Sequence, residues 1–456
     1  MGQNPRRAAV EALVRVHREG GYSNLVMESL LDKSPLREED RAFASRLFYG
    51  VIERRLTLDY ILAAHSSMKL KKLHPTVLEL LRTGGYQLLY MDRVPASAAV
   101  NETVKLARTM GQERAAGYIN AVLRAVNRDR AHLFDRLPEG MEGVSVRTSC
   151  PLPLLTLWSE AYGPAMAERL AESANEPPPA YIRINTLKTS ESAFYAAAEE
   201  AGIRLEKLDC LPACARVENP GLLKKLAQTF ESWYYHQDIA SQLCCAALAP
   251  RPGERVADVC AAPGGKSLTA AQMMENRGEI LAGDLYPAKC DAMAKRATAM
   301  GVSILRTAAR DASAPCPEPL RGAFDRVICD APCSGLGVIR RKPEIRYKEP
   351  ESFAALPETQ YAILCEAARM VRDGGVLQYS TCTLNPAENE AVSARFLREH
   401  PEFSPRALPL SLSLWDFSLR DGPPSHELTL FPPVHGADGF YIAGFVKAGT
   451  GDTRMR

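Results

Sequence analysis

The sequence lacks the features that mark membrane, secreted and metal-binding proteins. None of its apolar runs approaches the roughly 18 residues that a membrane-spanning helix needs, and the amino terminus does not read as a secretory signal. Twelve cysteines are present, but none forms a CxxC pair, and the eight histidines show no metal-ligand spacing. We therefore expect a cytoplasmic protein without a membrane segment, a disulfide framework or a metal, in which most cysteines are buried thiols.

Net charge is also small, at +2 over 456 residues, but it is unevenly distributed. Residues 1–130 hold 21 basic and 14 acidic side chains, whereas the remainder holds 35 basic and 40 acidic ones. A basic front end suggests contact with a polyanion such as RNA, although on charge alone an ordinary soluble surface would look the same. The length is enough for about three domains.

Apolar spacing and breakers divide the chain into four parts. Residues 1–132 repeat apolar side chains at helical spacing and predict an all-α domain, followed by a Pro- and Gly-containing linker at 133–148. Residues 149–236 predict a small α+β unit, with a helix over 153–174, a strand over 181–186 and a helix over 192–202.

Residues 237–449 alternate strands and helices, which predicts a Rossmann-like α/β domain with a mostly parallel, doubly wound sheet. The predicted strands are 255–260, 279–284, 303–307, 324–330 and 376–381. The predicted helices are 267–275, 289–300 and 358–371.

Acidic residues stand at the carboxyl ends of these strands, where doubly wound sheets bind their ligands. They are Asp258, Asp284, Asp311 and Asp330, and Cys382 stands at the end of the fifth strand. The first strand runs into a turn of small residues, 260–266, that leads into a helix and lets a ligand approach the backbone closely. The turn is neither GxGxxG nor a Walker loop, and with the acidic series it favours an adenosyl ligand over NAD or ATP.

Three of these segments resemble the RNA 5-methylcytosine methyltransferases of the Nol/Nop/Sun family. They are Cys260-Ala261-Ala262-Pro263-Gly264-Gly265-Lys266, Asp330-Ala331-Pro332-Cys333-Ser334-Gly335 and Ser380-Thr381-Cys382. Asp438-Gly439-Phe440-Tyr441 is similar to the family's closing strand. Residues 100–104 and 118–123 are similar to the NusB RNA-binding helical domain, and this fusion is typical of bacterial methyltransferases of small-subunit (16S) ribosomal RNA.

The resemblance implies a cofactor site and a catalytic set. S-adenosylmethionine would lie against Cys260, Ala261, Ala262, Pro263, Gly264, Gly265 and Lys266, with Asp284 on the ribose, Asp311 near the adenine and Asp330 near the methionine end. Cys382 would be the nucleophile that adds to carbon 6 of cytosine, Cys333 would assist product release, and Asp330 would hydrogen-bond or protonate N3.

RNA contacts are predicted at two places. Arg340, Arg341 and Lys342, with the nearby Arg346 and Lys348, could hold phosphates, and a solvated charge run is the alternative. Arg183 and Asn185 on the strand over 181–186 could contact RNA, and ordinary sheet packing would explain that strand equally.

Three other functions stay open from the residues alone. The substrate could be a transfer RNA, because nothing in the predicted cleft selects the RNA. The chain could be an RNA-binding assembly factor whose enzyme domain has decayed, although its motif residues are all present. A dehydrogenase is disfavoured by the missing GxGxxG. We expect a monomeric enzyme with ribosomal RNA as its partner.

Overall fold

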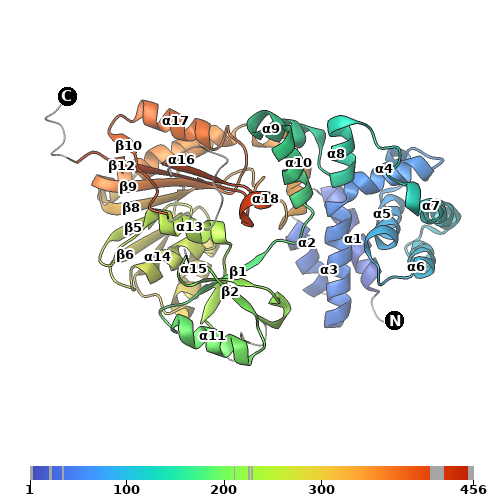
Figure 1. Cartoon of the computed structure of the whole chain (residues 1–456), viewed down its shortest axis with the longest axis horizontal. Coiled ribbons are helices and arrows are strands. Elements are labelled where there is room, and N and C mark those ends of the chain that lie inside the picture. The colour runs from blue at the N-terminus through green and yellow to red at the C-terminus, as the bar shows by residue number, and fades with distance from the viewer. Residues whose placement is uncertain are drawn as a thin grey trace. The chain divides into compact units, whose positions relative to one another are not determined.

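A computed structural model gives the fold of the chain (Figure 1) and describes residues 4–19, 23–32, 35–209, 211–223, 226, 230–410 and 426–449. The chain divides into two compact units. Unit 1 comprises residues 1–176 together with 339–350, and unit 2 comprises 177–338 and 351–456. Within the described ranges, no helix has both the length and the apolar character needed to cross a membrane.

Unit 1 is helical, as the apolar spacing predicts. Its helices are α1 (Pro5–Glu19), α2 (Ser23–Asp32), α3 (Glu38–Glu53), α4 (Arg55–His65), α5 (Pro75–Tyr90), α6 (Ala96–Thr109), α7 (Ala116–Arg128), α8 (Gly140–Thr148), α9 (Leu152–Tyr162) and α10 (Pro164–Ser173). On α7 the side chains of Ile119, Val122, Leu123 and Val126 are buried, so one stripe of the helix faces the core. These stripes pack together as the core of the helical bundle.

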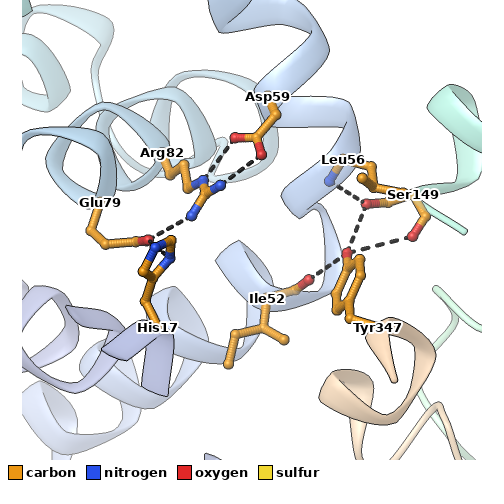
Figure 2. Close-up of polar contacts among 8 residues, drawn as sticks. All are labelled: His17, Ile52, Leu56, Asp59, Glu79, Arg82, Ser149 and Tyr347. Carbon is orange, nitrogen blue, oxygen red and sulfur yellow. Dashed lines mark hydrogen bonds and ion pairs between the residues drawn. The ribbon is translucent and has the colours of Figure 1, made fainter. Parts of the chain in front are cut away.

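An ion cluster built on the buried pair Glu79 and Arg82 ties three helices of unit 1 together (Figure 2). The guanidinium of Arg82 on α5 donates two hydrogen bonds to Asp59 on α4, at 2.7 and 2.6 Å, and one to Glu79, at 2.6 Å. His17 on α1 lies 3.4 Å from the same Glu79 oxygen. Burial alone would raise the pKa of Glu79, but His17 and Arg82 lower it below its ordinary value. The cluster is therefore a charge-satisfied contact inside the bundle.

Residues 339–350 belong to unit 1 although they follow the Cys333 motif in the sequence. Arg346 is buried and donates to the backbone oxygens of Glu53 and Ala174, at 3.2 and 2.8 Å, and to the side chain of Asn175, at 3.0 Å. The hydroxyl of Tyr347 donates to Ile52 O at 2.9 Å, and Ser149 Oγ lies 3.1 Å away (Figure 2). Arg346 thus anchors the segment and is not part of a phosphate-binding surface, because it is buried and both of its terminal nitrogens donate inside the unit.

Two predictions for residues 133–174 need correction. The predicted linker contains α8, where a Cβ on Gly143 would stand 2.1 Å from Pro138 O, so this glycine lets the preceding loop approach the helix closely. The single helix predicted over 153–174 is two helices, α9 and α10. They are separated at Gly163, which has a φ of +84°, and α10 begins at Pro164.

The amino-terminal part of unit 2 is a small antiparallel sheet packed against a helix. Strands β1 (Ala180–Ile184), β2 (Leu205–Lys207), β3 (Cys214–Val217) and β4 (Tyr234–His236) pair in the order β2-β3-β1-β4, and α11 (Glu191–Glu200) packs on them. Strand β4 is followed by α13 (Ile239–Leu248), the first helix of the carboxyl-terminal part of unit 2, which contains a larger sheet.

The larger sheet has eight strands within the described residues. Parallel strands β5 (Arg255–Asp258), β6 (Glu279–Asp284), β7 (Leu305–Ala309), β8 (Phe324–Asp330) and β9 (Val371–Thr381) lie in the order β9-β8-β5-β6-β7. Strand β12 (Phe440–Lys447) extends the sheet antiparallel to β9, and β10 (Phe403–Pro405) and β11 (Glu427–Leu430) pair with β12. The five predicted strands are all present.

Helices cover both faces of this sheet (Figure 1). One face carries α16 (Leu356–Met370) and α17 (Glu390–Glu399), and the other carries α13 (Ile239–Leu248), α14 (Gly265–Met273) and α15 (Pro287–Ala299). Along β8, Val327 and Cys329 pack on the first face and Ile328 on the second, which is the alternation of a strand buried on both sides. The predicted doubly wound domain is confirmed.

Candidate active site

The acidic residues meet at one edge of the larger sheet because its central strands are parallel. Asp258, Asp284 and Asp330 are the last residues of β5, β6 and β8, and Cys382 follows β9 directly. Asp311 stands two residues beyond the end of β7. The sequence therefore placed these five side chains at a common edge correctly.

The turn over 260–266 connects β5 to α14. It is held by Ala261 N, which donates to Gly283 O at 2.7 Å, and by Gly264 N, which donates to Ala261 O at 2.7 Å. Gly264 has a φ of +94°, a conformation that favours glycine. α14 begins at Gly265, so the unpaired N–H groups of its first turn lie beside the turn.

A cavity of about 200 Å³ lies against this turn. Small residues of the turn and charged or polar side chains from four other segments line it: His236, Gln237, Asp238, Ser241, Asp258, Ala261, Ala262, Pro263, Gly265, Lys266, Arg296 and Asp330. Gln237 is largely buried, and its Nε2 has no hydrogen-bond partner among the described residues. The cavity wall thus offers both carboxylates and an unused amide donor to a ligand.

Lys266 and Asp330 form an ion pair in the cavity wall. Lys266 Nζ lies 2.6 Å from Asp330 Oδ2, and Ser380 Oγ donates to Asp330 Oδ1 at 2.8 Å. The ammonium also stands 5.2 Å from the centre of the Phe440 ring. Burial alone would lower the pKa of Lys266, but the negative charge of Asp330 raises it above its ordinary value. Lys266 is therefore a fixed positive charge.

Asp258 is the most deeply buried carboxylate of the edge, with 1% of its surface exposed. Ser267 Oγ donates to its Oδ2 at 2.7 Å. Burial, with the nearby charge of Asp330, raises the pKa of Asp258 to about 7, although Ser267 and Lys266 act in the opposite direction.

Asp284 and Asp311 are arranged as local turn acceptors. Asp284 Oδ1 accepts from Tyr286 N at 3.2 Å and lies 3.5 Å from Lys289 Nζ. Asp311 Oδ1 accepts from the backbone and hydroxyl of Ser313, at 2.9 and 2.7 Å, which lowers the pKa of Asp311. Neither side chain lines the cavity of about 200 Å³, so their predicted ribose and adenine contacts stay predictions.

The two motif cysteines are brought together from positions 49 residues apart, with their Sγ atoms 3.4 Å from each other. Both are partly exposed, whereas seven of the other nine described cysteines are buried. The hydrogen bond to Cys382 and burial raise the pKa of Cys333 well above its usual value. Cys333 is thus held as a neutral thiol that can donate to Cys382.

The turn that carries Cys333 is inserted between the end of β9 and the start of β12. Gly337 N donates to Cys382 O at 3.0 Å, and Gly439 N donates to Gly337 O at 2.8 Å. A Cβ on Gly337 would stand 1.9 Å from Gly439 O and 2.8 Å from Cys382 O. Because Gly337 and Gly439 have no side chains, the turn can pack directly against the Asp438–Tyr441 motif.

Arg183 and Asn185, the residues of the small sheet predicted to contact RNA, have a structural role in this structure. Arg183 and Asn185 are buried, and Arg183 donates to Gln272 Oε1 and Pro212 O, both at 3.0 Å. Asn185 Nδ2 donates to Ser232 O and Met300 O, at 2.8 and 2.9 Å. Side chains with their donors used inside the protein do not reach an RNA surface in this conformation.

The basic run after the Cys333 turn is only partly exposed. Arg340 is buried, with 8% of its surface accessible, so the prediction of a phosphate contact fits it poorly. Arg341 and Lys342 are exposed and stay candidates for RNA contact.

The sequence patterns did not predict several residues of the site. Ser241 and Arg296 line the cavity, and Gln360 and Glu388 support the cysteine turn. Glu388 belongs to a polar stretch, 385–390, that comes three residues after Cys382. That position was the one signal available for it, since Gln360 lies on an ordinary amphipathic helix.

Comparison with known proteins matches three family descriptions along the chain. Residues 3–128 match the NusB family, 151–223 match a ferredoxin-like domain of RsmF/B-like methyltransferases, and 245–446 match 16S rRNA methyltransferase RsmB/F.

Whole-chain relatives agree with these matches. The probable ribosomal RNA small subunit methyltransferase B of Bacillus subtilis is 34% identical and covers 97% of this chain and 99% of its own. Its counterpart in Synechocystis is also 34% identical, with the same coverage. The crystal structure of PH0851 superposes with a TM-score of 0.79 at 24% identity, covers 98% of this chain and 100% of its own, and supports the fold. The chain belongs to the RsmB/F family of ribosomal RNA methyltransferases, with an amino-terminal NusB domain.

Proposed function

We propose that the protein methylates carbon 5 of a cytosine in small-subunit (16S) ribosomal RNA, with Cys382 as a covalent nucleophile and Cys333 as the releasing group. Membership of the family supports ribosomal RNA methylation. The observation that carries the covalent route is the pair of partly exposed thiols, 3.4 Å apart, next to the Lys266–Asp330 pair at the sheet edge.

The cofactor that fits is S-adenosylmethionine, which supplies the methyl group when bound. The cavity against the turn over 260–266 offers hydrogen-bond acceptors and a donor that match the polar groups of this molecule. The carboxylates of Asp258 and Asp330 suit hydroxyl and ammonium donors, and the unpaired Nε2 of Gln237 suits a carboxylate. Alanine and glycine in the turn leave room for close contact with its backbone.

Covalent attack is needed because carbon 5 of cytosine is a poor nucleophile. Cys382 as a thiolate forms an S–C6 bond, and the ring electrons move to carbon 5, which then takes the methyl group. N3 takes a proton from a water molecule, Asp330 accepts a hydrogen bond from the resulting N3–H, and Lys266 keeps the carboxylate in place. To reach Cys382, the target cytosine must unstack from its neighbours in the RNA.

Release requires the proton on carbon 5 to leave and the S–C6 bond to break. A water molecule takes the proton from carbon 5, the electrons of the C5–H bond re-form the C5–C6 double bond, and the sulfur of Cys382 departs as a thiolate. The proton on N3 returns to solvent. Cys333 stands within hydrogen-bond distance of that sulfur and can stabilise it as it leaves.

The test is a denaturing gel on unmethylated 16S ribosomal RNA with S-adenosylmethionine. Cys333→Ala is expected to give a protein–RNA band that survives denaturation, and Cys333→Ala combined with Cys382→Ala is expected to give none. A band that persists in the double variant would overturn the role of Cys382. A band with transfer RNA but not with ribosomal RNA would move the proposal to the other substrate.

A further inference from the structure

The two cysteines differ in how the protein holds them. Cys382 directly follows β9, whose last residues pair with β8 over 376–380 and with β12 over 376–381, so regular backbone hydrogen bonds fix its position. Cys333 stands in an irregular turn whose two ends are anchored by backbone hydrogen bonds. Ala331 N donates to Ser380 O before the turn, and Gly337 N donates to Cys382 O after it. Val338 N donates to Gly335 O at 3.0 Å at the end of the turn. The peptide groups on either side of Cys333 are held by side-chain contacts instead.

Two buried side chains supply those contacts on either side of Cys333. Gln360 Nε2, from α16, donates to Pro332 O at 2.9 Å, on the peptide group that precedes Cys333. Glu388 Oε2 accepts from Ser334 N at 2.8 Å, on the peptide group that follows it. Gln360 Nε2 also donates to Glu388 Oε2 at 2.8 Å, so the two side chains act as one clamp.

Glu388 is fully buried, and its carboxylate accepts two further hydrogen bonds. Ser334 Oγ and Asn385 Nδ2 donate to Oε1, at 2.5 and 2.9 Å. Its backbone oxygen accepts from the hydroxyl of Tyr379 at 2.5 Å. A buried carboxylate costs much free energy unless it is fully hydrogen-bonded, as this one is. The cavity against the turn over 260–266 does not include it, so cofactor binding does not explain its presence.

We propose that Glu388, with Gln360, is a positioning residue that holds the Cys333 thiol against Cys382 for the release step. This inference rests on the proposed covalent function. Because Cys382 and the Lys266–Asp330 pair are held by other contacts, loss of the clamp leaves attack and methyl transfer largely intact. It displaces only Cys333, so the covalent RNA complex forms and then persists.

The experiment compares steady-state turnover with the denaturing-gel band for the full-length protein. Glu388→Gln keeps the size of the side chain but replaces one acceptor oxygen by a donor that faces other donors. Its turnover is expected to fall about 100-fold, as a displacement of about 1 Å can cause, while KM for S-adenosylmethionine changes little. The protein–RNA band is expected to accumulate as it does for Cys333→Ala. Adding Cys382→Ala to Glu388→Gln should abolish the band.

Two further variants make the result specific. Asp325→Asn is the matched control, because Asp325 accepts hydrogen bonds from Arg255 N and Arg372 at the other end of β8; it should give normal turnover and no band. Gln360→Leu removes the contact before Cys333 and the link to Glu388, but leaves the Glu388 contact after Cys333 in place. It serves if Glu388→Gln does not fold, as judged by circular dichroism. It should also accumulate the band.

The outcomes separate this inference from the proposed function. If Cys333→Ala gives the band but folded Glu388→Gln or Gln360→Leu does not, the positioning role is overturned and the covalent mechanism stands. If Cys333→Ala gives no band on bound, unmethylated RNA, the release role of Cys333 fails and this inference fails with it.

Discussion

At the scale of single residues, Asp258 carries a charge that the fold disfavours. Its pKa is raised from 3.8 to about 7, so the folded state binds this proton more tightly than the unfolded state does. Ionisation therefore destabilises the fold progressively as pH rises from about 4 to about 7, by a total of about 4 kcal/mol. Protonated Asp258 therefore stabilises the fold at low pH, and this contribution is lost above about pH 7.

Asp258→Asn should remove this pH dependence, because an amide oxygen can still accept from Ser267 and carries no charge. We expect its melting temperature to exceed that of the wild type at pH 8 and the difference to shrink towards pH 4, measured by thermal unfolding without cofactor. Asp325→Asn is an informative comparison, since Arg255 and Arg372 lower the pKa of Asp325 against the effect of burial. That variant should lose stability at pH 8, and equal behaviour of the two would contradict the account.

How much of the site is readable from the sequence depends on the kind of contact. Asp258, Asp284, Asp330 and Cys382 could be placed because strand ends in a parallel sheet share one edge. The approach of Cys333 to Cys382 could be expected only from the family resemblance, since 49 residues separate them. Burial of Arg183 and Asn185 was missed because alternation along a strand does not say which face another domain covers.

At the scale of elements, Arg346 and Tyr347 hold the segment 339–350 in unit 1. Arg346→Ala removes its hydrogen bonds and leaves the oxygens of Glu53 and Ala174 without this donor. We expect a loss of about 3 kcal/mol in the stability of unit 1. Hydrogen–deuterium exchange should report it as faster exchange at the carboxyl end of α3 and in α10.

Arg341→Ala is the matched control for that change. It removes the same type of side chain from the same segment, but at an exposed position, so exchange in α3 and α10 should stay as in the wild type. Equal effects of the two variants would mean that Arg346 is not the anchor.

Elements with strong periodicity were predictable, and those that depend on tertiary contact were not. Strands β6 and β8 match their predicted bounds, because each has a short apolar run, 280–282 and 327–329, and ends at an aspartate. The two glycines of α8 have low helix propensity, so the sequence predicts a linker there. Packing decides there instead, since Gly143 allows contact with Pro138 O.

At the scale of the whole molecule, the uneven charge bears on the proposed RNA partner. Unit 1 contains the basic front end, and Lys69, Lys71 and Lys72 are exposed together at the short 3-10 helix Leu70–Lys72. A cluster of this kind can neutralise phosphates, and each neutralised phosphate releases counterions. Binding of 16S ribosomal RNA should therefore weaken steeply with rising salt.

Replacing the three lysines by glutamine tests whether this cluster carries part of that charge contact. We expect binding to weaken and the slope of log affinity against log salt to become shallower by about 1 for each lysine that contacts a phosphate, in filter-binding titrations. The comparison is a variant with Arg251, Arg277 and Arg321 changed to glutamine. These exposed residues lie near the amino-terminal ends of the parallel strands, opposite the candidate active site. Both variants lose three positive charges, so an equal change of slope would show that total charge governs binding, and the cluster in unit 1 would have no special part in it.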